Sequence, residues 1–202
     1  MVVGVDEAGR GPLLGPMVIA TVHIPSEDTW LNSSPVTDSK DLTAAEREDL
    51  VEEIIDRYNY RAVTISAYEI DEAVTKPGDS LTELEIRYIK RLIAGETADQ
   101  ISIDAPNKKN PFNADNIVYE QEADAKYKCV GAASILDKTI RDHAVQRISE
   151  EIGEEIGSGY PSDPATQSYI EGADLDKHFI RTSWKPIKKI KTQREQTSLP
   201  TT

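Results

Sequence analysis

The stretch VVGVDEAGRGPLLGP, from Val2 to Pro16, is the part of this chain that decides its fold. The apolar, mostly β-branched run at residues 2–5 predicts a buried strand. Two adjacent acids, Asp6 and Glu7, follow it directly. A buried, unpaired carboxylate is costly enough that such groups normally pair, become protonated or bind a metal ion. Because Arg10 alone cannot neutralise both acids, the sequence favours a metal site at the end of this strand.

The glycines after these acids predict a tight turn. Gly9-Arg10-Gly11-Pro12 would leave backbone amides open to a closely approaching ligand. The spacing of Gly9, Gly11 and Gly15 is faintly similar to a dinucleotide-binding turn, but that motif opens a helix, and Pro16 would break its first turns. No G-x-x-x-x-G-K-[ST] phosphate loop occurs in the chain. On the two acids alone, a solvated turn remains as good an explanation as a metal site.

Length and cysteine content narrow the class of protein. A chain of 202 residues fits one domain of ordinary size with a real core. It starts with a strand rather than a charged and apolar leader, and no apolar run approaches the length of a membrane span, so we expect a soluble cytoplasmic protein. The single cysteine, Cys129, excludes an internal disulfide and a cysteine-based zinc site, and its apolar neighbours predict a small core residue.

The net charge is −13, whereas a protein that binds polyanions is expected to be basic, because neutralising phosphates supplies much of the affinity. Either the substrate is not nucleic acid, or the acidic groups lie away from a locally basic site. Acidic runs such as Glu150-Glu151 and Glu154-Glu155 lead to the hypothesis of adaptation to a salty cytoplasm. Positive charge gathers in the last segment, at Arg181, Lys185, Lys188, Lys189 and Lys191.

Hydrophobic periodicity predicts an α/β fold with a mixed sheet flanked by helices, because strands and helices alternate along the chain. The second strand should form a hairpin with the first, and Thr43 with Glu46 predicts a capping box. Residues 26–36 are expected to be a polar loop. Strands are predicted at 2–5, 17–24, 60–66, 100–106 and 116–119, and helices at 43–58, 67–74, 80–95, 125–152, after Pro164 and within 175–191.

Three acidic points share one sequence context: Asp6 with Glu7, Asp104, and Asp124 each close an apolar strand or open the element after one. Strand ends of a mixed sheet converge at a crevice, so the four could meet. Four carboxylates within about 5 Å would repel by roughly 3 kcal/mol per pair at an effective dielectric constant near 20. Oxygen ligands without histidine favour Mg²⁺ or Mn²⁺. Two such ions clamp the oxygens of a phosphoryl displacement, so phosphodiester hydrolysis is the leading chemistry.

Residues Val3 to Pro12 resemble the signature of the ribonuclease HII family, the type 2 ribonucleases H. Two later segments, the one that starts at Gly157 and the one that contains Trp184, resemble the archaeal branch of that family. The resemblance continues in order through Asp38-Ser39-Lys40, Ser102-Ile103-Asp104, Ala123–Tyr127, Ala132–Ile135, Gly157–Pro164 and Ser183-Trp184-Lys185.

The resemblance implies a ribonuclease H-like fold, and we expect the catalytic domain to cover residues 1–172. The lysine-rich residues 173–191 are expected to form a helical substrate-clamping segment, and the polar residues 192–202 a flexible tail. It implies that Asp6, Glu7, Asp104 and Asp124 are the catalytic acids and hold two Mg²⁺ or Mn²⁺ ions. Adjacent strand residues point to opposite faces, so Glu7 is expected to share the site only if the chain already bends there.

Family members cleave the RNA strand of RNA/DNA hybrids and nick duplex DNA 5′ of an embedded ribonucleotide, leaving 3′-hydroxyl and 5′-phosphate ends. The expected partners are therefore these nucleic acids, with no membrane and no obligate protein partner, and the chain is expected to be a monomer.

The resemblance also implies the substrate contacts. The backbone of Gly9, Arg10 and Gly11 would contact the 2′-hydroxyl, which distinguishes RNA from DNA, and Tyr160 would pack on the sugar at the RNA–DNA junction. Lys40 matches a phosphate-contacting lysine, although Asp41 stands where many members have a second basic residue. Without the resemblance, Tyr160 would be interpreted as a loop anchor and the basic residues as solvated charges. Further backbone contacts are expected from Lys126, Lys138, Arg141 and Lys185.

Two other functions remain open at this stage. A structure-selective DNA endonuclease, such as a junction resolvase, could use a similar acidic quartet, but the glycine-arginine-glycine turn and Tyr160 argue against it. A non-catalytic protein that binds hybrids is opposed by the complete quartet. An all-DNA junction substrate and a cleavage assay with magnesium would distinguish them.

Overall fold

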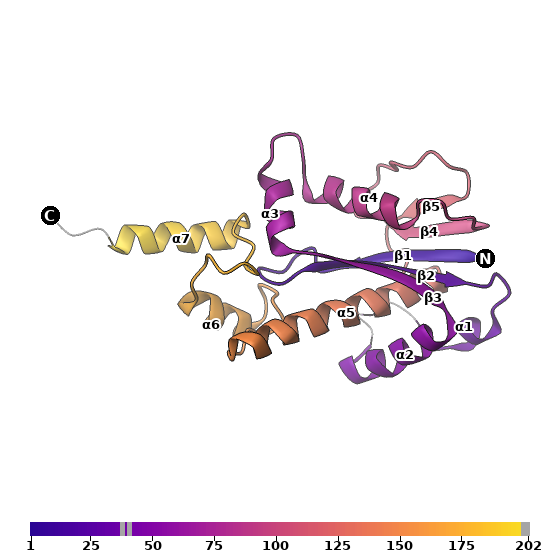
Figure 1. Cartoon of the computed structure of the whole chain (residues 1–202), viewed down its shortest axis with the longest axis horizontal. Helices are drawn as coiled ribbons and strands as arrows, with labels where there is room; N and C mark the ends of the chain where they lie inside the picture. Colours follow the sequence, from indigo (N-terminus) through magenta and orange to yellow (C-terminus); the bar gives the residue numbers. More distant parts are fainter. Residues whose placement is uncertain (37–38, 40–41, 199–202) are drawn as a thin grey trace. The chain divides into compact units, whose positions relative to one another are not determined.

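The computed structural model describes residues 1–36, 39 and 42–198 of the chain (Figure 1). These residues form two compact units, each assembled from segments that are separate in the sequence. The sheet unit comprises Met1–Ala8, Val18–Thr64 and Thr82–Arg141, and the turn unit comprises Gly9–Met17, Ile65–Leu81 and Asp142–Thr202.

Five strands form one mixed sheet in the order β3-β2-β1-β4-β5. The central strand β1 pairs antiparallel with β2, from Val2↔Ile24 to Ala8↔Val18, and parallel with β4. The predicted α/β mixed sheet and its first hairpin are therefore confirmed. The strands are β1 (Val2–Ala8), β2 (Met17–Ile24), β3 (Asn59–Ile65), β4 (Gln100–Asp104) and β5 (Ile117–Glu120).

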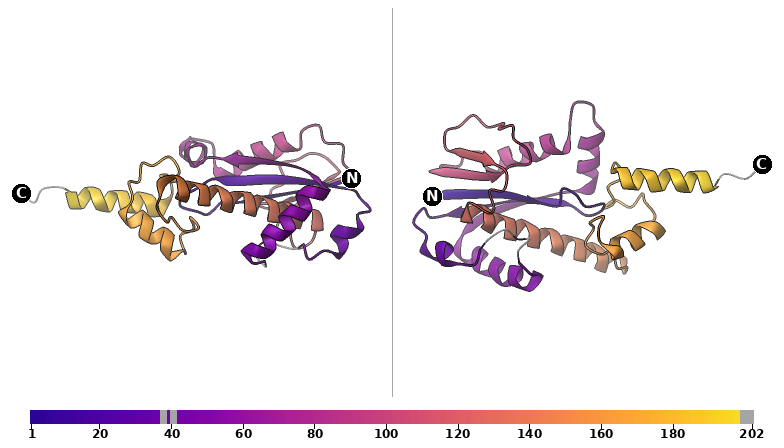
Figure 2. Two further views of the ribbon diagram at one scale, coloured as in Figure 1. Left: turned by 60° about the horizontal axis from the view of Figure 1, so that its bottom comes forward. Right: turned by 180° about the vertical axis from the view of Figure 1, so that it is seen from behind.

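Helices cover both faces of the sheet within the sheet unit. α2 (Ala44–Arg57) and the first half of α5 (Lys128–Ile152) lie on one face, and α4 (Leu81–Leu92) lies on the other (Figure 1, Figure 2). The buried cluster between β2, α2 and α5 contains Ala20, Val22, Ile24, Leu50, Ile54, Ala132 and Ala133.

The loop expected at residues 26–36 contains a short helix, α1 (Thr29–Ser33), so that prediction was wrong. The Asp28 carboxylate accepts a hydrogen bond from the Leu31 N–H at 2.6 Å and caps the helix. Leu31 is buried in the core. The predicted capping box of α2 is confirmed, because Thr43 and Glu46 exchange both hydrogen bonds.

The turn unit has its own core. α3 (Ala67–Thr75), α6 (Pro164–Gly172), α7 (Lys185–Ser198) and the second half of α5 belong to it. Pro164 occupies the first turn of α6, as expected. The buried cluster contains Leu13, Leu14, Val145, Ile156, Tyr169, Ile170, Phe179, Ile180 and Ile187.

The C-terminal segment differs from the prediction. The helix expected within 175–191 begins only at Lys185, because residues 179–181 run alongside residues 13–15 and use their backbone groups there. The tail expected from Thr192 is helical as far as Ser198. Arg194 donates to the carbonyls of Ile170 and Ala173 at 2.8 and 2.7 Å and ties α7 to the end of α6.

Cys129 is buried in the core, and burial raises the pKa of its thiol, which confirms the predicted packing role. None of the helices in the described residues combines the length and the apolar character needed to cross a membrane.

The backbone of helix α5 packs directly against Gly4 of the central strand. A Cβ atom built on Gly4 would lie 2.0 Å from the Cys129 carbonyl oxygen and 2.5 Å from the Val130 nitrogen. Both of these are backbone atoms, so the helix would have to move to make room. Gly4 therefore sets the distance between β1 and α5, on the face of β1 to which Asp6 also points.

We expect Gly4→Ala to lower the free energy of unfolding by about 1–3 kcal/mol or more, because it overpacks a backbone contact. Chemical denaturation measures the change. Gly172→Ala is the control, because nothing lies within 4 Å of its added Cβ, and it should be neutral or stabilising by up to about 1 kcal/mol. Equal stability of Gly4→Ala and the wild type would contradict the close contact.

Candidate metal centre

The site forms where β4 stops and β1 continues. The parallel pairing of these strands ends at Val5↔Ile103, and β4 itself ends at Asp104. Beyond Val5, the edge of β1 that faced β4 is no longer covered by that strand. Asp6 lies at this position and is buried, with 6% of its surface exposed. A carboxylate is thus placed inside the protein but beside the end of a strand.

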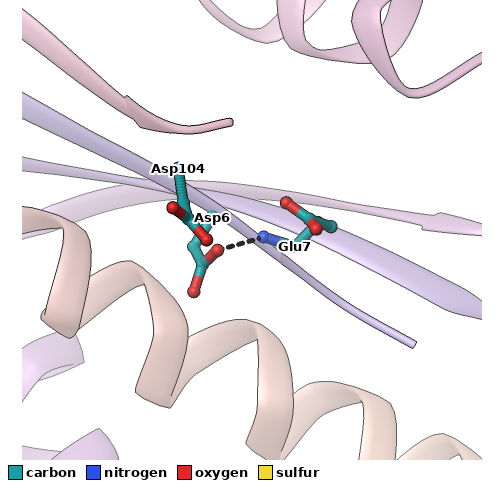
Figure 3. A group of neighbouring side chains, drawn as sticks. All are labelled: Asp6, Glu7 and Asp104. Atoms are coloured by element: carbon teal, nitrogen blue, oxygen red, sulfur yellow. Dashed lines mark hydrogen bonds between the residues drawn. The ribbon is translucent and has the colours of Figure 1, made fainter. Parts of the chain in front are cut away.

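Three carboxylates gather at this point. Asp6, Glu7 and Asp104 each offer an oxygen within 4.8 Å of the others (Figure 3). The Glu7 N–H donates to Asp6 Oδ1 at 2.8 Å. The expected bend is not how Glu7 shares the site, because β1 stays regular and paired with β2 up to Ala8. Because β4 ends at Asp104, the side chains of Asp6 and Glu7, which start on opposite faces of β1, can approach each other around the end of that strand.

Asp124 lies outside this group of three but acts on it. Its side chain is buried, and its negative charge is one of the causes that raise the pKa of Asp6. The preceding residue, Ala123, donates its N–H to Asp104 Oδ1 at 2.9 Å and ties this segment to the end of β4. The four predicted acids therefore belong to one electrostatic neighbourhood of the sheet unit, with three of them close enough to share an ion.

Burial, then the negative charge of Asp104, raises the pKa of Asp6 to about 8, and the charge of Asp124 adds to this effect. Hydrogen bonds from Ser134 and from the Glu7 N–H act in the opposite direction. Asp6 is thus poorly tolerated as an anion without a compensating cation. A set of carboxylate oxygens around such a group fits a hard divalent cation such as Mg²⁺ or Mn²⁺.

Sequence reasoning missed two residues of α5 that face this cluster. The Ser134 hydroxyl hydrogen bonds to Asp6 and lies 2.9 Å from the Ser39 hydroxyl oxygen. Asp137, one turn later, is 1% exposed, and its Oδ2 accepts no hydrogen bond from the described residues. Burial and then the charges of Asp6 and Glu7 raise the pKa of Asp137 well above its usual value. The available signal was an acid within an apolar helical stretch.

The predicted substrate-contacting turn belongs to the turn unit. Gly9 has a φ of +94°, a conformation that favours glycine. Gly11 is exposed, and a Cβ built on it would meet nothing within 4 Å, so packing does not require glycine there. The Leu13 N–H donates to the Gly159 carbonyl at 2.7 Å and links this turn to the loop that carries the half-buried Tyr160. Two segments far apart in the sequence are thereby joined.

The basic residues predicted to contact substrate have different surroundings. Lys126 forms an ion pair with Glu120 at 3.4 Å and is 52% exposed, while Lys138 is half-buried on α5. Lys185 is exposed at the start of α7. Arg141 is fully buried, so its side chain does not reach a substrate in this structure, and we leave it out of the proposed contacts. Lys40 and Asp41 lie outside the described residues.

This sheet, with helices on both faces, defines an α/β protein of the ribonuclease H-like class. A solved structure of ribonuclease H2 from Pyrococcus horikoshii OT3 is similar with a TM-score of 0.84 and 32% identity, over 96% of this chain and 99% of that one. The PCNA:RNase HII complex from Archaeoglobus fulgidus gives a TM-score of 0.81 and 29% identity, over 94% and 96% of the two chains.

Sequence comparisons identify the family. The family model for Ribonuclease HII matches residues 3–187. The Ribonuclease HII of Methanothermobacter thermautotrophicus is 38% identical over 94% of this chain and 98% of its own length. That of Methanopyrus kandleri is 35% identical over 98% and 97%. The chain belongs to the ribonuclease HII family and is a hydrolytic endonuclease that cleaves RNA in RNA/DNA hybrids.

A more distant structure shares the fold. Bst-RNase HIII in complex with Mn²⁺ has a TM-score of 0.80 at 16% identity, over 96% of this chain and 70% of that one. At that identity the likeness supports the fold only. The acidic cluster of the present chain is therefore the local observation that points to a divalent cation.

We expect the metal-free protein to lose stability as pH rises from about 4 to about 8. In the folded protein the pKa of Asp6 is about 8, above its usual value of 3.8. Protonation of Asp6 therefore stabilises the folded state fully below pH 3.8, and this stabilisation is lost as pH rises through about 8. Mg²⁺ should consequently stabilise the protein more at the higher pH. Thermal unfolding with and without Mg²⁺ measures both effects.

The control variants for this measurement are Asp6→Asn and Asp56→Asn. Asp6→Asn should lose most of the Mg²⁺ response, whereas Asp56→Asn, which alters an exposed acid of α2, should keep it. If Mg²⁺ stabilised the wild type equally at the lower and the higher pH, the assignment of the metal centre to Asp6 would be contradicted.

Proposed function

We propose that this protein nicks duplex DNA on the 5′ side of an embedded ribonucleotide, in addition to cleaving the RNA strand of hybrids, and leaves 3′-hydroxyl and 5′-phosphate ends. The supporting observation is the group formed by Asp6, Glu7 and Asp104, which each offer one carboxylate oxygen within 4.8 Å of the others. Membership of the ribonuclease HII family supports the substrate class.

Asp6, Glu7, Asp104 and Asp124 would hold two Mg²⁺ or Mn²⁺ ions. When bound, such ions supply an activated water and neutralise charge on the attacking and leaving oxygens of the phosphodiester. The protein contributes the position of the ligands. The Glu7 N–H and the Ser134 hydroxyl orient the Asp6 carboxylate, and the Ala123 N–H orients Asp104. These hydrogen bonds fix the ligands before substrate arrives.

The turn unit would recognise the ribonucleotide. The exposed backbone at Gly11 and the open space around it suit a 2′-hydroxyl or a phosphate that approaches closely. Tyr160, whose loop is joined to the turn through the Leu13–Gly159 hydrogen bond, would pack on the sugar at the RNA–DNA junction. Glu7 and Gly9 are two positions apart in the sequence, so the metal ligands and the recognition turn are consecutive parts of the chain.

Exposed basic residues would hold the phosphate backbone despite the net charge of −13. Lys185, Lys188 and Lys189 are exposed on α7. The exposed Lys126 precedes α5, and the half-buried Lys138 lies in its first half. A local group of lysines can attract a polyanion even where the total charge is negative. Lys40 would add a contact from outside the described residues.

We expect no protein partner to be required for cleavage. All four proposed metal ligands come from this one chain, although the Archaeoglobus fulgidus relative was solved in complex with PCNA.

The direct test is incubation of the wild-type protein with a labelled DNA duplex that contains one ribonucleotide, in Mg²⁺ and in Mn²⁺, next to an all-DNA duplex. We expect a single nick 5′ of the ribonucleotide and no cleavage of the all-DNA control. Asp6→Asn should lower turnover by at least about 100-fold, because even outer-shell changes at metal sites cost 10–100-fold. Duplex binding by that variant should change little.

An intact ribonucleotide-containing duplex under all metal conditions would refute the nicking activity. Wild-type turnover by Asp6→Asn would refute the metal centre instead. Asp56→Asn, which alters an exposed acid, serves as the matched control and should be fully active.

A further inference from the structure

The fully buried guanidinium of Arg181 lies against the backbone of residues Gly9–Gly15, the recognition turn, within the turn unit. Its Nη2 donates to the Gly9 carbonyl at 2.7 Å, and its Nη1 donates to the Arg10 carbonyl at 3.0 Å. Nε and Nη2 both donate to the Gly15 carbonyl at 3.1 Å. One side chain thus holds three carbonyls from the two ends of the turn.

The segment that carries Arg181 is itself held firmly. The Gly15 N–H donates to the Phe179 carbonyl at 2.8 Å, and the Arg181 N–H donates to the Leu13 carbonyl at 2.9 Å. An isolated antiparallel bridge joins the residues between these two pairs. The backbone next to Arg181 therefore has a fixed position relative to the turn.

Residues on the other side of Arg181 are anchored by α3. Asp71 accepts the N–H groups of Thr182 and Ser183 at 2.6 and 3.0 Å and also accepts both of their hydroxyls. The ring of Trp184 lies 5.1 Å from the Arg181 guanidinium carbon and covers it. These contacts restrict the rotamer of Arg181 and keep its fork directed at the turn.

The hydrogen bonds to Gly9 and Arg10 also orient the amides of the turn. A trans peptide unit is planar, so its N–H points away from its C=O. Because the Gly9 and Arg10 carbonyls face the guanidinium, the N–H groups of Arg10 and Gly11 in the same peptide units face away from it. The positive charge of Arg181 behind the turn adds to the attraction of these amides for an oxygen ligand.

We infer that Arg181 is the positioning residue for ribonucleotide recognition: it holds the Arg10 and Gly11 amides in the orientation that binds the 2′-hydroxyl and the adjacent phosphate. This inference rests on the proposed function. Arginine suits the task because its planar fork offers five donors, whereas lysine offers one ammonium group. Arg181 does not touch the substrate and acts through the turn.

Arg194 provides a matched control. It belongs to the same unit and also donates to three backbone carbonyls, those of Ile170, Glu171 and Ala173 at 2.8, 2.6 and 2.7 Å. These carbonyls lie at the end of α6 and not in the turn. Replacing Arg194 removes a similar number of hydrogen bonds without altering the turn.

The experiment compares Arg181→Met and Arg181→Lys with Arg194→Met and Arg194→Lys in the full chain. Binding of two duplexes is measured in metal-free buffer, one with a single ribonucleotide and one all-DNA, together with cleavage in Mg²⁺. For Arg181→Met we expect the preference for the ribonucleotide duplex to fall about three- to tenfold, the effect of losing one hydrogen bond to a hydroxyl. We expect kcat/KM on that duplex to fall about 100-fold.

The Arg194 variants should lose stability but keep the binding preference. Arg181→Lys should recover part of the preference, and if Arg181→Met does not fold, Arg181→Lys compared with Arg194→Lys decides. An unchanged preference in the folded Arg181 variants, or no preference in the wild type, would overturn the inference while wild-type nicking still supports the proposed function. Absence of wild-type nicking would instead refute the proposed function.

Discussion

Repulsion between buried carboxylates is the constraint on which this structure depends. Asp6 and Asp104 lie on neighbouring strands of one sheet, and the shorter strand ends where their side chains meet. Burial and this neighbour raise the pKa of Asp6 to about 8, far from its usual value of 3.8. A fold that only needed stability would place apolar residues here. The arrangement is best explained by a divalent cation that offsets the repulsion.

The sheet and most of the candidate site could be predicted from the sequence, because the signals are local. Apolar runs ending in Asp6 and Asp104 mark strand ends, and capping residues such as Thr43 mark helix starts. Such patterns indicate where a strand or helix ends and therefore which side chains lie at its end. The pattern did not show how Glu7 joins Asp6, since that depends on where the neighbouring strand stops.

Residues whose role depends on tertiary contacts escaped prediction. Asp137 and Ser134 look like ordinary polar positions of a long helix until α5 is packed on β1, at the distance that Gly4 sets. Arg181 was grouped with the exposed lysines of the C-terminal segment as one more positive charge, yet it is fully buried against the Gly9–Gly15 turn. Charge alone could not separate a buried structural arginine from a phosphate contact.

The most direct measurement of the metal centre is a crystal structure of the wild-type protein soaked in Mn²⁺, with anomalous diffraction used to locate the ion. We expect an anomalous peak coordinated by the carboxylates of Asp6, Glu7 and Asp104, at oxygen distances of about 2.0–2.3 Å typical of such ions. Full occupancy of Mn²⁺ elsewhere in the molecule, with these carboxylates left unliganded, would contradict a metal centre at the end of β4.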